Sequence, residues 1–369
     1  MKKYLLIAAV VLVGLGVLAV VVGRKADEPR GVVAYRGDAA HRGVFAGPGP
    51  AKLQAPRWSF QSGYAIVGSP VTAGDAVYVG SMDRKLYALD AATGEKRWAV
   101  SVDGSIFGAP AFAGRRVIVA DGGGSVTAVE AGSGAPVWKF AAGAELRGTP
   151  LVYDDLVFVG GMDGKLRALS AGDGQLKWQV ELGEPLEGSV STAQGTLYVA
   201  SARGGLFALG TSGQVKWTFR MAGGTLATPA IHEGVVYIGG RDRKFYAVDA
   251  ASGQLKWMFP AGNEVASSAA VTAEAVLFGC DDSRIYALNP VTGALLWSQA
   301  TRGMVNGSPA IAGQAVYYGS RDGTLYAANL KTGNPLGQFQ AGGWVRSAPT
   351  IVGSRLYVGA DDGRLYAFD

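Results

Sequence analysis

The sequence contains very few of the residues on which disulfide, metal and acid–base chemistry depend. Among its 369 residues, only Cys280 is a cysteine and only His41 and His232 are histidines. A single cysteine excludes an intrachain disulfide and a multi-thiolate metal site, and two histidines leave too few ligands for a zinc site of the usual kind. We therefore expect neither a metal centre nor a bound cofactor.

Positive charge is scarce outside the N-terminal region. The formal net charge of the chain is +5, but residues 1–57 hold nine Lys or Arg against three Asp or Glu. The remaining residues hold 25 basic and 26 acidic side chains. A nucleic-acid-binding domain concentrates its basic residues on the folded surface. The near-neutral remainder therefore predicts no nucleic-acid partner.

Charge is absent from residues 4–22, a run of nineteen apolar or small residues. As a helix, this run can just cross a hydrocarbon core about 30 Å thick. A cleaved signal peptide is the alternative, with Val17, Leu18 and Ala19 as its small-residue cleavage site. We expect a single hydrophobic helix within residues 1–23 that anchors an extracytoplasmic, periplasmic domain to the inner membrane. Secretion after cleavage stays open.

Residues 24–57 lack any sustained hydrophobic period and are rich in Gly, Pro and charge, which predicts a linker. The linker contains Arg36-Gly37-Asp38, a tripeptide known from cell adhesion. Short motifs often match by chance. We interpret this one as part of a loop that docks on the edge of the following domain.

The abundant feature of the chain is an internal repeat of forty residues, together with 56 glycines. A tryptophan recurs at this spacing, with one step of thirty-nine residues, and Gly337 stands where an eighth tryptophan would fall. The seven tryptophans are Trp58, Trp98, Trp138, Trp178, Trp217, Trp257 and Trp297. Such a period indicates a solenoid, a propeller or an array. We interpret the tryptophans as structural, each burying about 150–250 Å² against the next unit.

Each repeat contains four short strand-like segments, which in the first unit are residues 69–72, 76–80, 85–90 and 97–100. Asp-Gly pairs between the second and third segments, such as Asp163-Gly164, predict two-residue type I′ hairpin turns. Four short antiparallel strands per forty residues form one blade of a β-propeller.

The two ends of the repeat region complement each other. The eighth unit has only three strands, whereas the first tryptophan, Trp58, lies on a strand with no unit of its own. Pairing these two leftovers removes an open sheet edge. The sequence therefore predicts an all-β, eight-bladed propeller over residues 58–369, closed by its N-terminal strand.

The segment from Ala88 to Trp98 resembles the tryptophan-docking motif of PQQ-type β-propellers, as do those from Ala247 to Trp257 and from Ala287 to Trp297. This family includes quinoprotein alcohol dehydrogenases and BamB-like proteins, and the resemblance covers residues 58–369. For the dehydrogenases of this family, the resemblance implies a quinone cofactor that is held by a vicinal disulfide, a stacked Trp and a calcium ion. Cys280 has no neighbouring Cys, and the repeats carry no long insertion to cover a quinone.

We therefore expect a protein that is not an enzyme. The resemblance implies a non-catalytic, BamB-like scaffold that binds other envelope proteins, as in outer-membrane protein assembly, and we expect the propeller to be monomeric. A quinoprotein dehydrogenase-like enzyme and a surface sensor or adhesin stay open as alternatives.

The candidate binding site comes from the positions at which the repeats differ most. These lie between the fourth strand of one unit and the first strand of the next, so the segments should gather around the axis on one face. They place Arg, Glu and aromatic side chains together, a composition that favours binding hot spots. The candidate residues are Phe107, Arg147, Glu187, Trp344 and Arg346.

Overall fold

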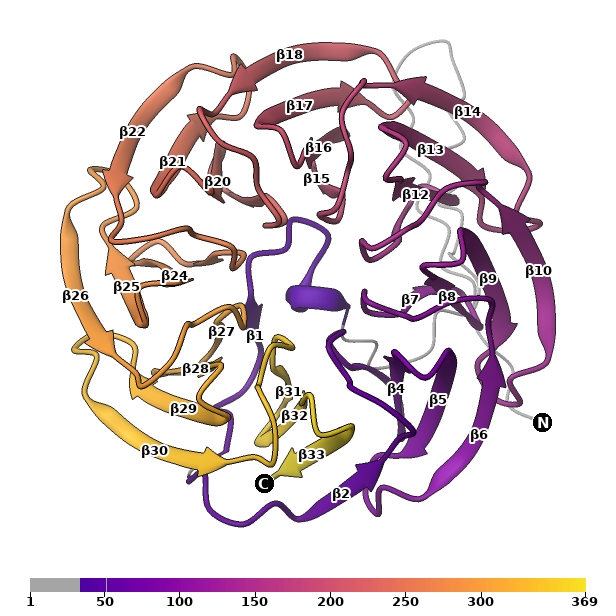
Figure 1. Cartoon of the computed structure of the whole chain (residues 1–369), viewed down its shortest axis with the longest axis horizontal. Coiled ribbons are helices and arrows are strands. Elements are labelled where there is room, and N and C mark those ends of the chain that lie inside the picture. The colour runs from indigo at the N-terminus through magenta and orange to yellow at the C-terminus, as the bar shows by residue number, and fades with distance from the viewer. Residues whose placement is uncertain (1–33, 51) are drawn as a thin grey trace, which may run out of the picture.

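The computed structural model describes residues 34–50 and 52–369, and over these residues the chain is a ring of eight antiparallel sheets around one axis (Figure 1). The prediction of an all-β, eight-bladed propeller is confirmed. The predicted hydrophobic helix of residues 1–23 lies outside the described residues. Within them, no helix is long and apolar enough to cross a membrane.

Seven blades are built from consecutive strands, which we letter A to D from the axis outward. Blades 1 to 4 comprise β3 (Val71–Ala73), β4 (Ala76–Ser81), β5 (Lys85–Asp90) and β6 (Lys96–Ser101); β7 (Ala111–Ala113), β8 (Arg116–Ala120), β9 (Ser125–Glu130) and β10 (Pro136–Ala141); β11 (Leu151–Tyr153), β12 (Leu156–Gly160), β13 (Lys165–Ser170) and β14 (Leu176–Glu181); and β15 (Ser191–Ala193), β16 (Thr196–Ala200), β17 (Gly205–Gly210) and β18 (Val215–Arg220).

Blades 5 to 7 follow the same order. They comprise β19 (Ala230–His232), β20 (Val235–Gly239), β21 (Lys244–Asp249) and β22 (Leu255–Pro260); β23 (Ala270–Val271), β24 (Val276–Cys280), β25 (Arg284–Leu288) and β26 (Leu295–Ala300); and β27 (Ala310–Ala312), β28 (Ala315–Gly319), β29 (Thr324–Asn329) and β30 (Pro335–Gln340).

Blade 8 combines both ends of the propeller sequence. Its inner strands are β31 (Thr350–Val352), β32 (Arg355–Gly359) and β33 (Arg364–Phe368), and its D strand is β2 (Trp58–Gln61). β2 pairs antiparallel with β33, with Trp58 opposite Ala367. Because the C and D strands of this blade come from distant parts of the chain, no C–D turn joins them.

Alternating strand directions give the ring two different faces. On the D–A face, the connection that enters each A strand bonds to the neighbouring B–C turn, as when Met82 N donates to Ala65 O over 3.0 Å. On the C–D face, the A–B and C–D turns lie together, as when Ala91 N donates to Asp75 O over 2.9 Å. Surface properties can therefore differ between the faces without disturbing the blades.

The B–C turns are not of the predicted type. Gly164 N donates to Gly161 O over 3.0 Å, and Gly164 has φ +78° whereas Asp163 does not have a positive φ. This is a type I turn closed by a left-handed glycine, so the expected type I′ turn at Asp163-Gly164 is wrong. The aspartate accepts a bond from Lys165 N over 3.3 Å, which agrees with its interpretation as a turn residue.

The seven tryptophans dock across the boundaries between blades, which we call seams. Each indole Nε1 donates to a carbonyl in the C–D turn of the next blade over 3.0–3.2 Å, as Trp98 does to Ala131 O. The indole lies on the turn glycine. A Cβ on Gly94, whose φ is +76°, would come within 2.5 Å of Trp58 Cε3. Each of these indoles therefore contacts two neighbouring blades.

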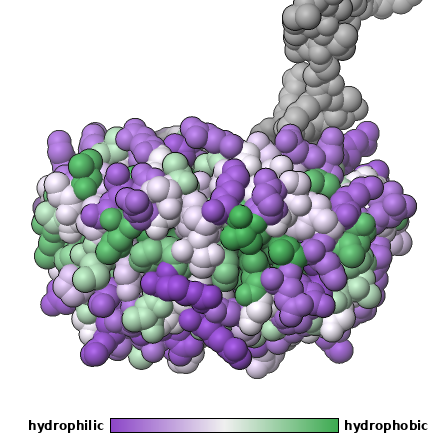
Figure 2. Space-filling view, turned by 90° about the horizontal axis from the view of Figure 1, so that it is seen from above, coloured by the Kyte–Doolittle hydropathy of each residue, from purple (hydrophilic) through white to green (hydrophobic). Residues whose placement is uncertain are grey.

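The outer wall of the ring is formed by the D strands, whose side chains alternate between partly buried and exposed. The B and C strands are mostly buried, and β4 is buried at all six positions. Figure 2 shows one side of this wall, where hydrophobic residues lie in small groups among hydrophilic ones. The core therefore consists of eight separate hydrophobic layers, one in each seam, rather than one central cluster.

The segment of residues 34–45 lies along the axis of the ring, where Figure 1 shows it in indigo. It forms the 3-10 turn η1 (Tyr35–Gly37) and then β1 (Val44–Phe45), which pairs in parallel with β27. Arg36 is 2% exposed, and its guanidinium donates to the carbonyls of Ala269 and Pro309. The expectation that Arg36-Gly37-Asp38 docks on the propeller edge is wrong, because the inner edges of the A strands along the axis offer the free backbone groups that this segment bonds.

Candidate functional site

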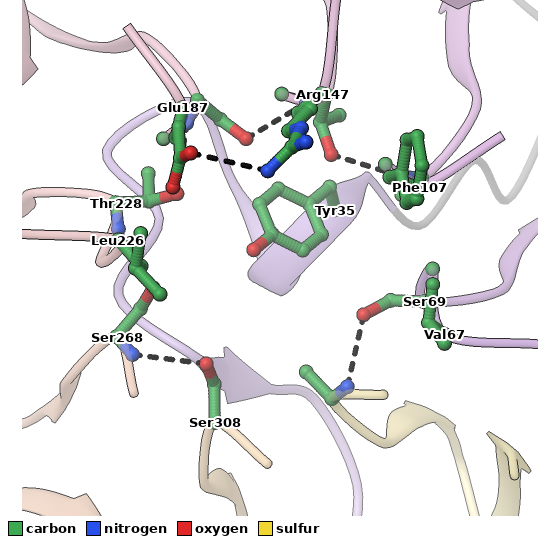
Figure 3. A pocket seen from close by; sticks show the side chains of 18 of the residues that line it. Tyr35, Val67, Ser69, Phe107, Arg147, Glu187, Leu226, Thr228, Ser268 and Ser308 are labelled. Carbon is green, nitrogen blue, oxygen red and sulfur yellow. Dashed lines mark hydrogen bonds and ion pairs between the residues drawn. The ribbon is translucent and has the colours of Figure 1, made fainter. Parts of the chain in front are cut away.

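The D–A connections surround a cavity of about 150 Å³ at the axis (Figure 3). Tyr35 closes it from within the ring, and four of the five candidate residues line it: Phe107, Arg147, Glu187 and Arg346. Trp344 lies two residues before Arg346 on the same connection. The five residues thus share one face, but they form two separate clusters.

The first cluster is centred on Arg147, which bridges three D–A connections. Its guanidinium lies 2.9 Å from Glu145, 3.1 Å from Glu187 and 5.6 Å from the centroid of the Phe107 ring. The hydrogen bond to Glu145 raises the pKa of Arg147 further above its ordinary value. With two carboxylates around one guanidinium, this cluster carries a net negative charge.

The second cluster is centred on Trp344, which is 46% exposed. Two guanidiniums lie against its indole, that of Arg321 at 5.1 Å and that of Arg346 at 5.8 Å from the ring centroid. Arg346 is also 2.8 Å from Asp361. An exposed indole held between cations is pre-organised to contact a partner, because its rotamer is already restricted.

Arg321 was not predicted from the sequence. It lies in the B–C turn of blade 7, at the position occupied by Met82 and Met162 in other blades. Sequence reasoning compared only the D–A connections, and the B–C turns were treated as hairpin turns. A comparison of B–C turns between repeats would have singled it out.

The sequence analysis also missed a ring of hydroxyl groups at the base of the cavity. Each hydroxyl accepts a hydrogen bond from a backbone N–H of the preceding blade over 2.9–3.1 Å. The acceptors are Ser69, Thr149, Ser189, Thr228, Ser268 and Ser308. Six of the eight residues directly before the repeated proline position are thus Ser or Thr, a signal visible in the sequence. These bonds join neighbouring blades at the axis.

Two side chains of types that often act in catalysis, His41 and Cys280, are buried. His41 donates to or accepts from Ser191 Oγ at 3.0 Å, and burial lowers its pKa to about 3. Burial raises the pKa of the Cys280 thiol to about 12. Neither side chain is therefore a base or a nucleophile near neutral pH. Among the described residues, no cluster of three His, Cys, Asp or Glu could hold a metal ion.

Comparisons with known proteins agree with this architecture. The profile of the family described as outer membrane protein assembly factor BamB matches residues 54–189, 163–308 and 281–369. No curated protein sequence matches the chain.

Solved structures with a similar fold include BamB, a quinohemoprotein alcohol dehydrogenase and a computational design. BamB from Moraxella catarrhalis is 20% identical, with a TM-score of 0.73, and the match covers 85% of this chain and 99% of that one. Quinohemoprotein alcohol dehydrogenase from Comamonas testosteroni is 15% identical, with a TM-score of 0.77 and coverage of 91% and 80%. The computationally designed Ika8 protein is 18% identical, with a TM-score of 0.77 and coverage of 85% and 99%. At these identities the likeness shows the fold alone.

Proposed function

Because the chain belongs to the family of the outer membrane protein assembly factor BamB, we propose that it is a non-catalytic, extracytoplasmic scaffold. Its D–A face binds other envelope proteins. The observation that carries this proposal is the second cluster, in which the half-exposed Trp344 lies between Arg321 and Arg346. Tryptophan and arginine at the centre of a surface are the residues most often responsible for binding energy.

The size of the axial cavity supports a binding role over dehydrogenase activity. Small-molecule and cofactor sites usually enclose about 300–1,000 Å³, whereas this cavity measures about 150 Å³. The chain also has only one cysteine, Cys280, where a quinone site of the dehydrogenase type needs an adjacent pair. The adhesin alternative depends on an exposed Arg36-Gly37-Asp38 motif, and Arg36 is buried on the axis.

The alternative function, a quinoprotein dehydrogenase, has a direct test. Purified protein is incubated with pyrroloquinoline quinone and calcium, and the visible spectrum and dye reduction by alcohols are recorded. We expect neither stoichiometric quinone binding nor turnover. Binding with turnover would replace the scaffold by an enzyme.

The scaffold itself is tested by site-specific photo-crosslinking in cells of the source organism. A photoreactive amino acid at position 344 should crosslink envelope proteins, whereas one at Lys331 on the C–D face should not. Changing Arg147, Trp344 and Arg346 together to Ala should abolish capture of the crosslinked protein in a pull-down. The melting curve should change little, since these side chains lie on connections rather than strands. Capture that survives the triple change would assign binding to another surface.

We also propose that residues 4–22 hold the scaffold at the inner membrane. In solution, the pairing of β2 with β33 closes the propeller. Within blade 8 this pairing spans four residue pairs from Trp58 to Gln61. Alkaline extraction of membranes should leave the intact chain in the pellet and release a chain that lacks residues 1–23. Release of the intact chain would contradict the anchor, and release of a chain shortened to begin after Ala19 would indicate the cleaved, secreted form.

A further inference from the structure

The hydroxyl groups around the base of the axial cavity, which we call the hydroxyl ring, carry hydrogen-bond donors that the protein itself does not use. Each of the six side chains is at most 9% exposed, and each hydroxyl oxygen accepts one backbone N–H. A Ser or Thr hydroxyl also has one O–H to donate. None of the six donates to an acceptor among the described residues, and all six line the cavity. Figure 3 shows four of them around Tyr35: Ser69, Thr228, Ser268 and Ser308.

Two backbone N–H groups add to these unused donors. Ala109 and Ala348 occupy the two positions of the hydroxyl ring that have no hydroxyl. The N–H groups that would bond there, those of Ser69 and Ser308, therefore lack the acceptor found at the other six positions. Neither N–H donates to another acceptor among the described residues. Because buried N–H groups are almost always paired, the ring is suited to a ligand that brings acceptor atoms.

A buried positive charge lies next to the hydroxyl ring. The guanidinium of Arg36 donates to the carbonyls of Ala269 and Pro309, each of which directly follows a member of the ring in the sequence. No carboxylate of the described residues forms an ion pair with Arg36, and that of the nearby Asp38 pairs with another arginine at 2.6 Å. Carbonyl dipoles stabilise a guanidinium but supply no countercharge. Since a buried charge without a countercharge is costly, a negative ligand is favoured over a neutral one.

The cavity has room for a small ligand only. Its volume is about 150 Å³, and an engineered apolar cavity of about this volume holds one benzene molecule. A ligand of roughly six non-hydrogen atoms or fewer therefore fits. Arg147 and Arg346 also line the cavity, but both are already paired with carboxylates. They contribute further N–H donors rather than net charge.

We propose that the axial cavity binds a small oxyanion, either a free phosphate ion or the carboxylate of a single acidic side chain. Its oxygens accept hydrogen bonds from the hydroxyl ring, and its charge compensates that of Arg36. The hydroxyls keep their bonds to the neighbouring blades, because each donates with its hydrogen while it accepts with its oxygen. The site does not use the Trp344 cluster, so it holds whether or not the D–A face binds envelope proteins.

The first test is isothermal titration of the full chain, kept soluble with a mild detergent, with inorganic phosphate and with acetate. All solutions contain the same concentration of sodium chloride, which keeps the screening of surface charge constant. Saturable binding of one anion per chain is expected. Acetate that displaces phosphate would identify a site that a side-chain carboxylate can also use, whereas phosphate binding unaffected by acetate would identify a site for the free ion. Absence of saturable binding by both anions would overturn the proposal.

A pair of adjacent serines locates the bound anion. Ser268→Ala removes one O–H of the hydroxyl ring and should weaken binding about tenfold, since a hydrogen bond to a charged group is lost. The matched control is Ser267→Ala. Ser267 is also buried, but its hydroxyl already donates to Gly279 O over 2.8 Å, so binding should not change. Equal binding by the native protein and Ser268→Ala would place the anion elsewhere and overturn the proposal.

A second pair of variants tests the charge. Ser308→Asp places a carboxylate in the hydroxyl ring beside Arg36 and should abolish anion binding. Ser308→Asn has nearly the same size without the charge. At pH 7 and without added phosphate or acetate, the Asp variant should melt at a higher temperature than the Asn variant, because only Asp supplies the countercharge. A lower melting temperature for the Asp variant, or native binding by it, would contradict an oxyanion site.

Discussion

Seven seams of this propeller are joined by a tryptophan and a C–D turn, and the eighth is joined by a segment from outside the repeats. At a regular seam, Trp98 both fills the space and donates a hydrogen bond to Ala131 O. At the seam between blades 7 and 8 (seam 7/8), Gly337 stands in the tryptophan register. There Leu53 lies against Gly337, and Pro50 O receives a bond from Tyr317. The same position in the ring is therefore occupied by different residues, because blade 8 has no C–D turn on which an indole could dock. A repeat can lose its signature residue where its docking partner is missing.

The largest effect should come from removing the strand that completes blade 8. Deleting residues 57–61 removes β2 and Trp58 and leaves β33 as an open edge. We expect the melting temperature to fall by about 10 °C, because the deletion removes both the docked tryptophan, worth up to about 3–5 kcal/mol, and the hydrogen bonds of a whole strand. Circular dichroism measures the change. Ser59→Ala, which alters an exposed side chain of the same strand, should have almost no effect. An unchanged melting temperature after the deletion would show that β2 does not stabilise the ring.

A regular seam should suffer more from truncation than seam 7/8. Trp98→Ala should lower the free energy of unfolding by about 3–5 kcal/mol, and Leu53→Ala by about 2–3 kcal/mol. Trp98→Phe keeps an aromatic ring in the seam but loses the hydrogen bond to Ala131 O. It should therefore lower the free energy of unfolding by at least about 1 kcal/mol less than Trp98→Ala does. Urea unfolding gives these values. A Leu53→Ala variant as stable as the native protein would mean that the N-terminal segment contributes nothing to the seam.

Acid should weaken the N-terminal segment before it weakens the regular seams. His41 is buried, and burial followed by the charge of Arg36 lowers its pKa to about 3. In the unfolded state the His41 imidazole has a pKa near 6.5, so it takes up a proton at a higher pH than in the folded state. The free energy of unfolding therefore falls as the pH decreases from about 6.5 toward 3. The loss is about 3 kcal/mol by pH 4.

Hydrogen exchange at several pH values measures this loss in residues 34–50 and in the Trp98 seam separately. A His41→Asn variant, which cannot take up the proton, should show a flatter dependence on pH in that range. Equal sensitivity of the two regions in the native protein, or an unchanged slope in the variant, would contradict the assignment to His41.

The smallest expected effect is a small gain in stability. Gly337 has an ordinary backbone conformation, and a Cβ there would lie 3.4 Å from Leu53 N, which is normal contact. Gly337→Ala should therefore stabilise the protein by about 0.5 kcal/mol through the unfolded state. The contrasting change is Gly94→Ala, which should cost about 1–3 kcal/mol because Gly94 has φ +76° and carries the Trp58 indole. Similar results for the two changes would remove the distinction between the seams.

The repeat made the ring predictable, because strand length, turn residues and the docked Trp98 all act within forty residues. Arg147, Glu187 and Arg346 were found by the same logic, since positions that the fold leaves free can differ between repeats. Pairing within the site was not predictable: Arg147 meets Glu187 only because two D–A connections converge at the axis.

The path of residues 34–57 could not be predicted, for a different reason. A segment that occurs once has no second copy with which to be compared. Its contacts are with residues far away in the sequence, and Arg36 bonds Ala269 O and Pro309 O, more than two hundred positions away. Arg36 would also be expected on the surface, since arginine is rarely buried without a carboxylate partner. Tertiary contacts alone decide its position.

The pairing of β2 with β33 also determines when the ring can close during synthesis. Trp58 emerges early, but its partner Ala367 follows some three hundred residues later. At about 5–20 residues per second, β2 waits roughly 15–60 s for its partner. During that interval, seven blades can form one after another while both outer ends stay unpaired. A nascent chain is therefore most exposed to aggregation and most dependent on chaperones just before its last blade is completed.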